Sequence, residues 1–335
     1  MNMLKKVDDE TLSVIRSVVT SGSFTLPESM LEKDVLVADV VERICDIGKK
    51  DGVKFVFCGG TSLSQAFQMI DRMSEDADFR ILLPESVKSQ NQQRNILSKI
   101  KKELVRSLDE MGHPLDGELK AGNANAYIMG NFLYAPQFPL HQSLRPHIKI
   151  EITTFEPISN LHDLPIRTIL DRIAGTPPDN ISRKVPVVSV ADTLADKIVS
   201  YLRRSASERS NIGNGSPDDR LVRHLYDAHK IISFVPDLRD RVISLFPNTM
   251  ERDRKTFGNQ FPAFKEDPGK VLREELEFVF SEETCARFGT FARSMIYGEI
   301  PDFRTVSSTF YDLASECLDL VQNHSIKNGF SFEPK

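Results

Sequence analysis

The sequence contains only four cysteines among 335 residues and no long run of apolar residues. The cysteines are Cys45, Cys58, Cys285 and Cys317, with no Cys-x-x-Cys pair and no histidine at the spacing of a zinc site. Such spacing argues against a disulfide framework or a structural zinc, and it is typical of a reducing compartment. A membrane-spanning helix needs roughly 18 uninterrupted apolar residues, so we expect no membrane contact.

A strong excess of charge of either sign is also lacking. The chain carries 43 Lys plus Arg against 48 Asp plus Glu, for a formal net charge of -5. This balance excludes a general binder of polyanions, so any contact with nucleic acid has to come from a local basic patch. The N-terminal sequence MNMLKKVDDE has acidic residues where a signal peptide needs an apolar core. We therefore expect a soluble, cytoplasmic protein.

Changes in hydrophobic period along the chain predict an α+β fold. Residues 1–50 have the three- and four-residue spacing of helices, and we interpret them as a helical leader that packs on the core. Residues 51–160 alternate between strand and helix patterns, which predicts a core with a small mixed β-sheet. Strand signals fade after about residue 160, so residues 161–335 are predicted to form a large helical C-terminal domain.

A glycine turn stands between a predicted strand and a predicted helix. The strand KFVFC (54–58) runs into Gly59 and Gly60, and helical spacing begins at Thr61. Glycine permits close approach, and main-chain N–H groups at a helix start attract negative charge, so a phosphate can bind here. An ordinary tight turn between a strand and a helix is an equally simple interpretation.

Two aspartates mark the next predicted strand, ADFRILL (77–83). Asp76 directly precedes this strand, and Asp78 lies within it. Asp76 and Asp78 are two positions apart, so both carboxylates point to the same side of a strand. Adjacent carboxylates repel unless a cation lies between them, and Mg²⁺ prefers such oxygen ligands together with phosphate oxygens. The alternative is a solvated, charged strand edge.

A third acidic candidate lies on the predicted strand HIKIEITTF (147–155). Its isoleucines form one face, and Lys149, Glu151 and Thr153 form the other. If this strand neighbours the strand of Asp76 and Asp78, Glu151 completes a three-carboxylate site for two divalent ions. Without that neighbour, the same pattern is an ordinary Lys/Glu face turned to solvent.

The helical half offers further candidates at the flanks of apolar stripes. Lys197 and Arg204 lie on one flank of the predicted helix 190–204, where two cations could meet a triphosphate. On the next helix Arg223 and Asp227 are four residues apart, away from its apolar stripe. A solvated surface lysine and a surface salt bridge are the simpler alternatives.

Taken together, FVFCGGTSLSQAF (55–67) and RMSEDADF (72–79) resemble the first motif of the AbiEii/AbiGii toxin family. These are nucleotidyltransferase-like proteins with a polymerase-β-type core. The motif residues at its end are Arg72, Ser74, Glu75, Asp76 and Asp78. ADTLADKIVSYLRR and RLVRHLYDAHKI resemble two later helices of the family, so that the resemblance covers roughly residues 50–235.

The resemblance implies a role for each candidate residue. The positions implied to bind the nucleotide phosphates are Gly59, Gly60, Thr61, Lys197 and Arg204. The implied ligands of Mg²⁺ are Asp76, Asp78 and Glu151, and Asp227 is implied to be an essential acid. Two departures stand out: His224 occupies the place of an aspartate that the family usually has, and Thr61 replaces a common serine.

The resemblance also implies an activity. The family transfers a nucleotide from an NTP, in several members to tRNA, and a cognate antitoxin restrains it, in toxin–antitoxin or phage-defence systems. Backbone contact with tRNA is expected from basic side chains at positions 99, 101, 102, 106, 203 and 204, unless these are solvated helix faces. Two alternatives are transfer to a small molecule or a protein side chain, and a non-catalytic member that binds NTP and acts through a protein partner.

Overall fold

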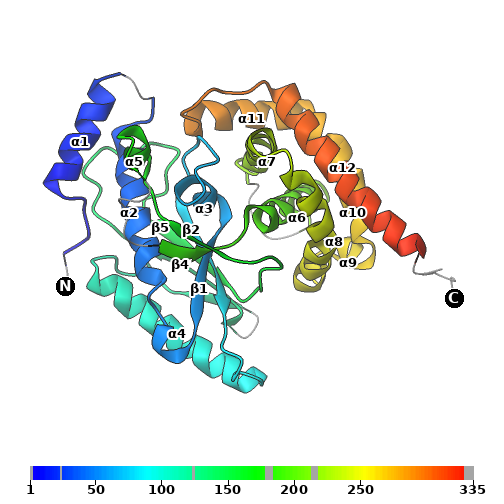
Figure 1. Cartoon of the computed structure of the whole chain (residues 1–335), viewed down its shortest axis with the longest axis horizontal. Coiled ribbons are helices and arrows are strands. Elements are labelled where there is room, and N and C mark those ends of the chain that lie inside the picture. Colours follow the sequence, from blue (N-terminus) through cyan, green and yellow to red (C-terminus); the bar gives the residue numbers. More distant parts are fainter. Residues whose placement is uncertain (1–2, 23–24, 123–124, 178–183, 213–217, 328–335) are drawn as a thin grey trace. The chain divides into compact units, whose positions relative to one another are not determined.

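The computed structural model describes residues 3–22, 25–122, 125–177, 184–212 and 218–327 (Figure 1). The chain divides into two compact units, Met1–Ser189 and Val190–Lys335, and each is described by itself. The first unit holds a seven-stranded sheet with its helices, and the second is helical. The predicted α+β class with a mixed sheet is therefore confirmed.

The elements of the first unit follow the chain in this order. Its helices are α1 (Asp9–Thr20), α2 (Glu28–Ile44), the 3₁₀ turn η1 (Lys49–Asp51), α3 (Gly59–Gln65), α4 (Gln90–Glu110) and α5 (Ile169–Ile173). Its strands are β1 (Lys54–Cys58), β2 (Asp76–Leu82), β3 (Lys120–Gly122), β4 (Tyr127–Phe132), β5 (Ile148–Thr153), β6 (His162–Pro165) and β7 (Lys184–Val187).

The strand order in the sheet is β3-β4-β5-β2-β1-β7-β6. β2 lies in the middle, antiparallel to β1 and parallel to β5. β4 is antiparallel to β5 and to β3, while β7 is parallel to β1 and antiparallel to β6. The mixed sheet thus brings β1, β2 and β5, which the alternating pattern predicted, side by side.

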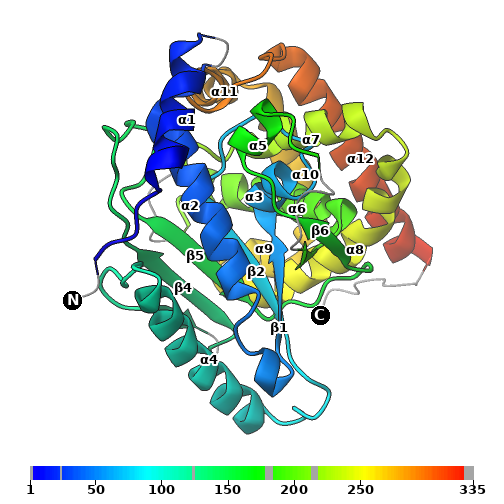
Figure 2. The ribbon, with the colours of Figure 1, turned by 60° about the vertical axis from the view of Figure 1, so that its left-hand side comes forward.

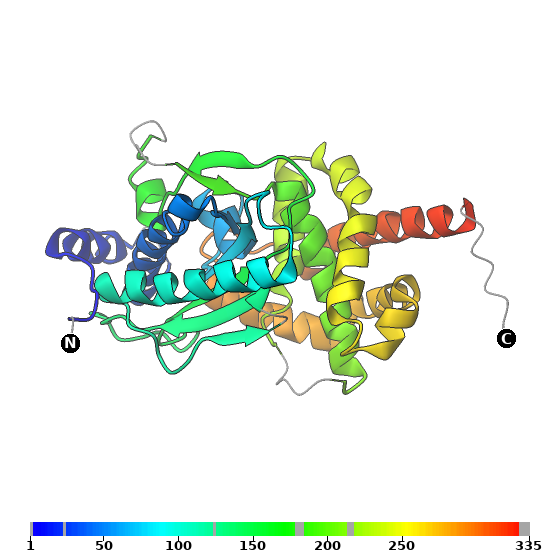
Figure 3. The same cartoon turned by 90° about the horizontal axis from the view of Figure 1, so that it is seen from below.

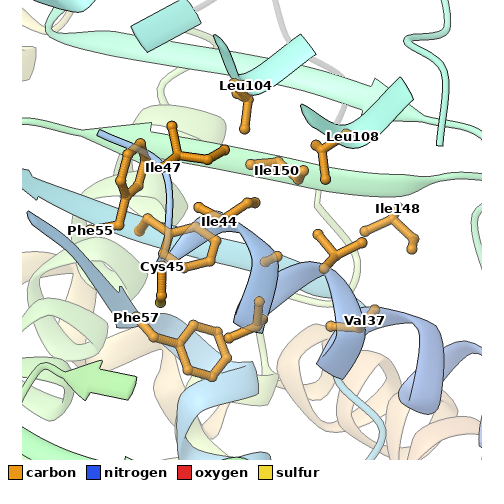
Figure 4. Packing of buried hydrophobic residues seen from close by; sticks show 14 of the residues in the cluster. Val37, Ile44, Cys45, Ile47, Phe55, Phe57, Leu104, Leu108, Ile148 and Ile150 are labelled. Atoms are coloured by element: carbon orange, nitrogen blue, oxygen red, sulfur yellow. The ribbon is translucent and has the colours of Figure 1, made fainter. Parts of the chain in front are cut away.

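One face of this sheet is covered by α2 and α4 (Figure 2). Val37 and Ile44 of α2 and Leu104 of α4 belong to the same buried cluster as Phe55 of β1 and Ile150 of β5 (Figure 4). Burying a side chain of this size stabilises the fold by about 1.5–3 kcal/mol. The apolar stripes that predicted these helices are therefore the surfaces that hold them on the sheet.

Alternation along β2 decides which side chains face away from that core. Ala77, Phe79 and Ile81 are buried in the cluster with α2 and α4. Since successive side chains point to opposite faces, Asp76 and Asp78 project from the other face of the sheet. The alternation that buries every second side chain of β2 therefore leaves the carboxylates of Asp76 and Asp78 side by side on the opposite face.

The sheet continues beyond residue 160, where the sequence predicted only the helical part. β6 and β7 are short, and their sequences HDLP and KVPV each contain a proline. Prolines remove ladder hydrogen bonds and are confined to sheet edges, bulges and strand ends. Strands of this length and composition carry too little periodicity to be recognised in a sequence.

The second unit contains α6 (Val190–Arg209), α7 (Arg223–Phe234), α8 (Leu238–Phe257), α9 (Pro262–Glu266), α10 (Pro268–Leu276), the 3₁₀ turn η4 (Glu277–Phe280), α11 (Glu282–Met295) and α12 (Phe303–Lys327). Within it, α12 packs on α7 and α8, and α6 packs on α8 (Figure 3). These helices lie within residues 161–335, which the sequence predicted to be helical. No helix in the described residues has the length and apolar character needed to cross a bilayer.

Candidate functional site

The glycine turn between β1 and α3 lies directly against the second aspartate of β2. Gly59 has a φ of +78°, a left-handed conformation that favours glycine. A Cβ atom at Gly59 would lie 2.2 Å from Oδ2 of Asp78, and one at Gly60 would lie 2.6 Å from Nη2 of Arg72. Gly59 is therefore favoured by its backbone conformation and by its close approach to Asp78, whereas a side chain at Gly60 would displace the guanidinium group of Arg72.

Thr61 fastens this turn to β2. Its side chain is fully buried. The hydroxyl group lies 2.9 Å from Oγ of Ser74 and donates a hydrogen bond to the carbonyl oxygen of Asp76. Because the hydroxyl is engaged inside the protein, a phosphate contact by Thr61 would have to come from its main-chain N–H.

The three predicted acidic residues lie on one face of two adjacent strands. In the parallel register of β2 and β5, Asp78 is paired with Glu151, and Asp76 with Lys149. Residues paired across neighbouring strands point to the same face. The neighbourhood on which the role of Glu151 depended is therefore confirmed, whereas the role itself stays a prediction.

Basic and hydroxyl groups accompany these carboxylates. The guanidinium group of Arg145 forms an ion pair with Asp76, and the ammonium group of Lys149 forms one with Glu151. The Tyr127 hydroxyl donates to Oε1 of Glu151 at 3.1 Å, and burial together with this carboxylate raises the pKa of Tyr127. Within the described part of the chain, no three His, Cys, Asp or Glu side chains are gathered closely enough to hold a metal ion as they stand.

Sequence reasoning missed a buried ion pair just behind Asp76. Nζ of Lys33, on α2, lies 2.6 Å from Oε2 of Glu75, and both side chains are almost completely buried. Burial raises the pKa of Glu75, but the ammonium group of Lys33 together with the N–H and guanidinium groups of Arg145 outweighs it, and the net shift is downward. The sequence offered Glu75 as a motif residue but gave no signal for Lys33, which looks like one charge in the run Glu32-Lys33-Asp34.

In the second unit the structure brings Lys197 and Asp227 together. Nζ of Lys197 lies 2.7 Å from Oδ2 of Asp227, and the two side chains are 6% and 0% exposed. The sequence placed Lys197 on the flank of α6 and turned Asp227 away from the apolar stripe of α7. Instead, the two charges are paired with each other and buried.

Arg204 and Arg223 share another carboxylate. Nη2 of Arg204 lies 2.8 Å and Nη1 of Arg223 3.1 Å from Oδ2 of Asp218. Burial raises the pKa of Asp218, but the two guanidinium groups outweigh it and hold that pKa at about 2. Arg223 therefore pairs with Asp218 in place of Asp227, four residues along its own helix. His224 is buried in the same helix.

The basic residues expected to contact RNA are divided between the units. Lys101 and Lys102 line a groove of about 800 Å³ together with Leu115 and Leu119. The groove lies along α4, on the sheet face opposite to the carboxylates. Arg203 is paired with Asp253 at 2.5 Å and is mostly buried. An RNA bound at Lys101 and Lys102 would have to pass around the sheet edge to reach the carboxylates.

The chain is similar to known nucleotidyltransferase toxins in its sequence profile and in its fold. The profile of the family described as nucleotidyl transferase AbiEii toxin, type IV toxin–antitoxin system, matches residues 48–309. Among solved structures, MenT4, a nucleotidyltransferase toxin from Mycobacterium tuberculosis H37Rv, is similar in fold, with a TM-score of 0.50 and 13% identity over 92% of this chain and 90% of that one. A search of curated proteins found no match. The family match covers most of the chain, which therefore belongs to the AbiEii family of nucleotidyltransferase toxins of type IV toxin–antitoxin systems.

Proposed function

We propose that this nucleotidyltransferase depends on Mg²⁺ and transfers a nucleoside monophosphate from an NTP to an RNA acceptor, with tRNA as the expected RNA. The observation that carries the proposal is the pairing of Asp78 with Glu151 across β2 and β5, with Asp76 on the same face. The glycine turn that touches Asp78 adds main-chain N–H groups suited to phosphate.

The chemistry of the donors fits a hard divalent cation. Asp76, Asp78 and Glu151 offer only carboxylate oxygens, which Mg²⁺ prefers together with phosphate oxygens. All three come from adjacent strands of one sheet, so the scaffold beneath them is rigid. When bound, the metal ion would neutralise the charge that builds up on the phosphates during transfer.

The reaction itself is a substitution at phosphorus. The oxygen of the acceptor hydroxyl forms a bond to the α-phosphorus of the NTP. The bond from the α-phosphorus to the oxygen that bridges the α- and β-phosphates breaks, and pyrophosphate leaves with that oxygen. The hydroxyl proton passes to a carboxylate of the acidic set. The protein contributes mainly by positioning and charge neutralisation, because it takes no part in a covalent intermediate.

Three residues of the helical unit complete the proposed set. Lys197 and Arg204 are proposed to contact the nucleotide phosphates, and Asp227 is proposed to be essential. Since Asp227 neutralises Lys197 at 2.7 Å, we propose that the carboxylate sets the position of the ammonium group. The family implies an NTP substrate and a cognate antitoxin, and we propose a cytoplasmic role in phage defence.

The decisive experiment follows the label from each NTP in turn. The protein is incubated with Mg²⁺, one α-labelled NTP and total tRNA, and the label is traced to RNA, protein or neither. We expect it in RNA, and we expect Asp76→Asn to lower transfer by about 100-fold or more because a metal ligand is lost. Asp163→Asn, an exposed aspartate on β6, serves as the matched control and should retain full activity.

Each result has a distinct meaning. Label in protein would point to a side-chain acceptor, and binding of NTP without release of pyrophosphate would point to a non-catalytic member. Full activity of Asp76→Asn would contradict the proposed metal site. Asp76→Asn should change the free energy of unfolding by less than about 1 kcal/mol, because the ion pair between Asp76 and Arg145 is partly exposed.

A further inference from the structure

The segment between β4 and β5 is fixed to the core at Arg145. The main-chain N–H of Arg145 donates to Oε2 of Glu75 at 2.9 Å, and its carbonyl oxygen accepts from Nζ of Lys33 at 2.8 Å. Lys33 and Glu75 are themselves paired and almost completely buried. A buried ion pair of this kind holds the main chain of Arg145 from both sides.

The side chain of Arg145 is in a different situation. It is 36% exposed, and its guanidinium group pairs with Asp76 while Nη1 lies 3.7 Å from Oε1 of Glu75. A partly exposed ion pair contributes little to stability, so the protein loses little when Arg145 leaves Asp76. Arg145 therefore combines a fixed main chain with a guanidinium group that can change partners.

One partner of that guanidinium group, Asp76, is a proposed metal ligand. As long as Arg145 is paired with Asp76, it occupies part of the carboxylate that a cation would need. Lys149 has the corresponding position on Glu151. These two basic side chains supply the positive charge that adjacent carboxylates require, and binding of a divalent cation to the same oxygens requires them to leave.

Once displaced, a guanidinium group beside an NTP site has one strongly preferred partner. Arginine binds phosphate oxygens through two parallel N–H donors. Arg145 lies on the first unit together with the carboxylates and the glycine turn. Lys197, which is also proposed to contact the phosphates, lies in the second unit, where it is paired with Asp227.

We propose that Arg145 is a phosphate-binding residue that exchanges between Asp76 and the triphosphate of the NTP. Lys33 and Glu75 act as positioning residues, because they keep the main chain of Arg145 in reach of both partners. The inference rests on the proposed function, since it requires a divalent cation at Asp76 and Asp78.

The test uses the full-length protein and two binding measurements without turnover. Binding of Mn²⁺ alone is measured by electron paramagnetic resonance. Binding of α,β-methylene analogues of the four NTPs, whose α–β linkage cannot be cleaved, is then measured at saturating Mn²⁺. Arg145→Gln should tighten Mn²⁺ binding by about threefold to fivefold because a competitor of the cation is removed. The same variant should weaken binding of the preferred analogue by about tenfold or more.

Tighter binding of Mn²⁺ together with weaker binding of the analogue identifies the exchange, because general damage to the site would weaken the binding of both. Arg145→Lys keeps the charge and should restore part of the analogue affinity, which also provides a reading if Arg145→Gln folds poorly. Arg94→Gln, at an exposed arginine of α4, should leave both affinities unchanged.

Two results would overturn the inference. If Arg145→Gln leaves both affinities unchanged, or lowers both, Arg145 does not exchange between these partners. The proposed function would survive that result, provided that the wild-type protein binds Mn²⁺ and Asp78→Asn abolishes this binding. If the wild-type protein binds no Mn²⁺ at the carboxylates, the metal site fails and the inference fails with it.

Discussion

Ion pairs of candidate residues on the sheet and the Lys197–Asp227 pair of the helical unit differ sharply in burial. On the sheet, the side chains of Asp76 and Glu151 are 26% and 32% exposed and paired with basic groups at the surface. In the helical unit, Lys197 and Asp227 are 6% and 0% exposed and paired with each other. Water can replace a partner lost at the surface but not one lost in the interior. Losing a partner should therefore cost little at the sheet pairs and much more at the buried Lys197–Asp227 pair.

Breaking the buried pair should have the largest effect on stability. Lys197→Met leaves the carboxylate of Asp227 without its cation, which we expect to lower the free energy of unfolding by about 3–5 kcal/mol. Urea unfolding measures this loss. The double variant Lys197→Met/Asp227→Leu should recover part of it, because no buried charge is left unpaired. A loss below about 1 kcal/mol for Lys197→Met would mean that water reaches the pair.

Asp34 allows the effect of burial on a carboxylate to be measured apart from ion pairing, because its hydrogen-bond donors are neutral. Asp34 accepts hydrogen bonds from the Gln65 side chain at 2.8 Å and from the Ile169 main chain at 2.6 Å. Burial raises the pKa of Asp34 from 3.8 to about 6. Between these pH values the folded chain holds a proton that the unfolded chain releases. The contribution of Asp34 to the free energy of unfolding is therefore full below pH 4 and is lost as the pH rises through 6.

The measurement compares wild type with Asp34→Asn, whose side chain does not titrate. The wild-type free energy of unfolding, taken relative to the variant, should fall by about 2 kcal/mol between pH 4 and pH 7. Other titrating groups cancel in this difference. A difference that stays constant over the range would show that Asp34 is ionised in the folded protein even at pH 4.

The smallest effect is expected where the same substitution is made at the surface. Lys149→Met removes the cation paired with Glu151, yet both side chains are partly exposed. We expect the free energy of unfolding to change by less than about 1 kcal/mol, measured under the urea conditions used for Lys197→Met. If the two lysine variants were equally destabilised, the contrast between the units would disappear.

The sheet core was predictable because its strands have a clear period. β2 and β5 alternate apolar and other side chains, β1 is a short apolar run, and each of the three strands lies within two residues of its predicted bounds. β6 and β7 were not predictable, since four-residue strands that contain proline have no readable alternation. The glycine turn was recognised as a feature, but the sequence shows neither the left-handed backbone of Gly59 nor its close approach to Asp78.

The candidate site was predictable only as far as local pattern reaches. Asp76 and Asp78 share a strand, so their common face follows from spacing alone. Lys33 has the pattern of a solvated charge on a helix, yet it is fully buried because its partners, Glu75 and Arg145, come from distant parts of the chain. Similarly, nothing in the sequence marks Arg145, which stands between elements. Partners of buried charges are set by topology, which a short pattern does not contain.

The parallel pairing of β2 with β5 has a consequence for synthesis of the chain. The carboxylates of Asp78 and Glu151 meet only when both strands are present and aligned. A ribosome that has released residues as far as α4 has produced the glycine turn and two aspartates, but not the third acid or Arg145. A polypeptide that ends before β5 therefore lacks the third acid, and the acidic face can assemble only after residue 151 has been made.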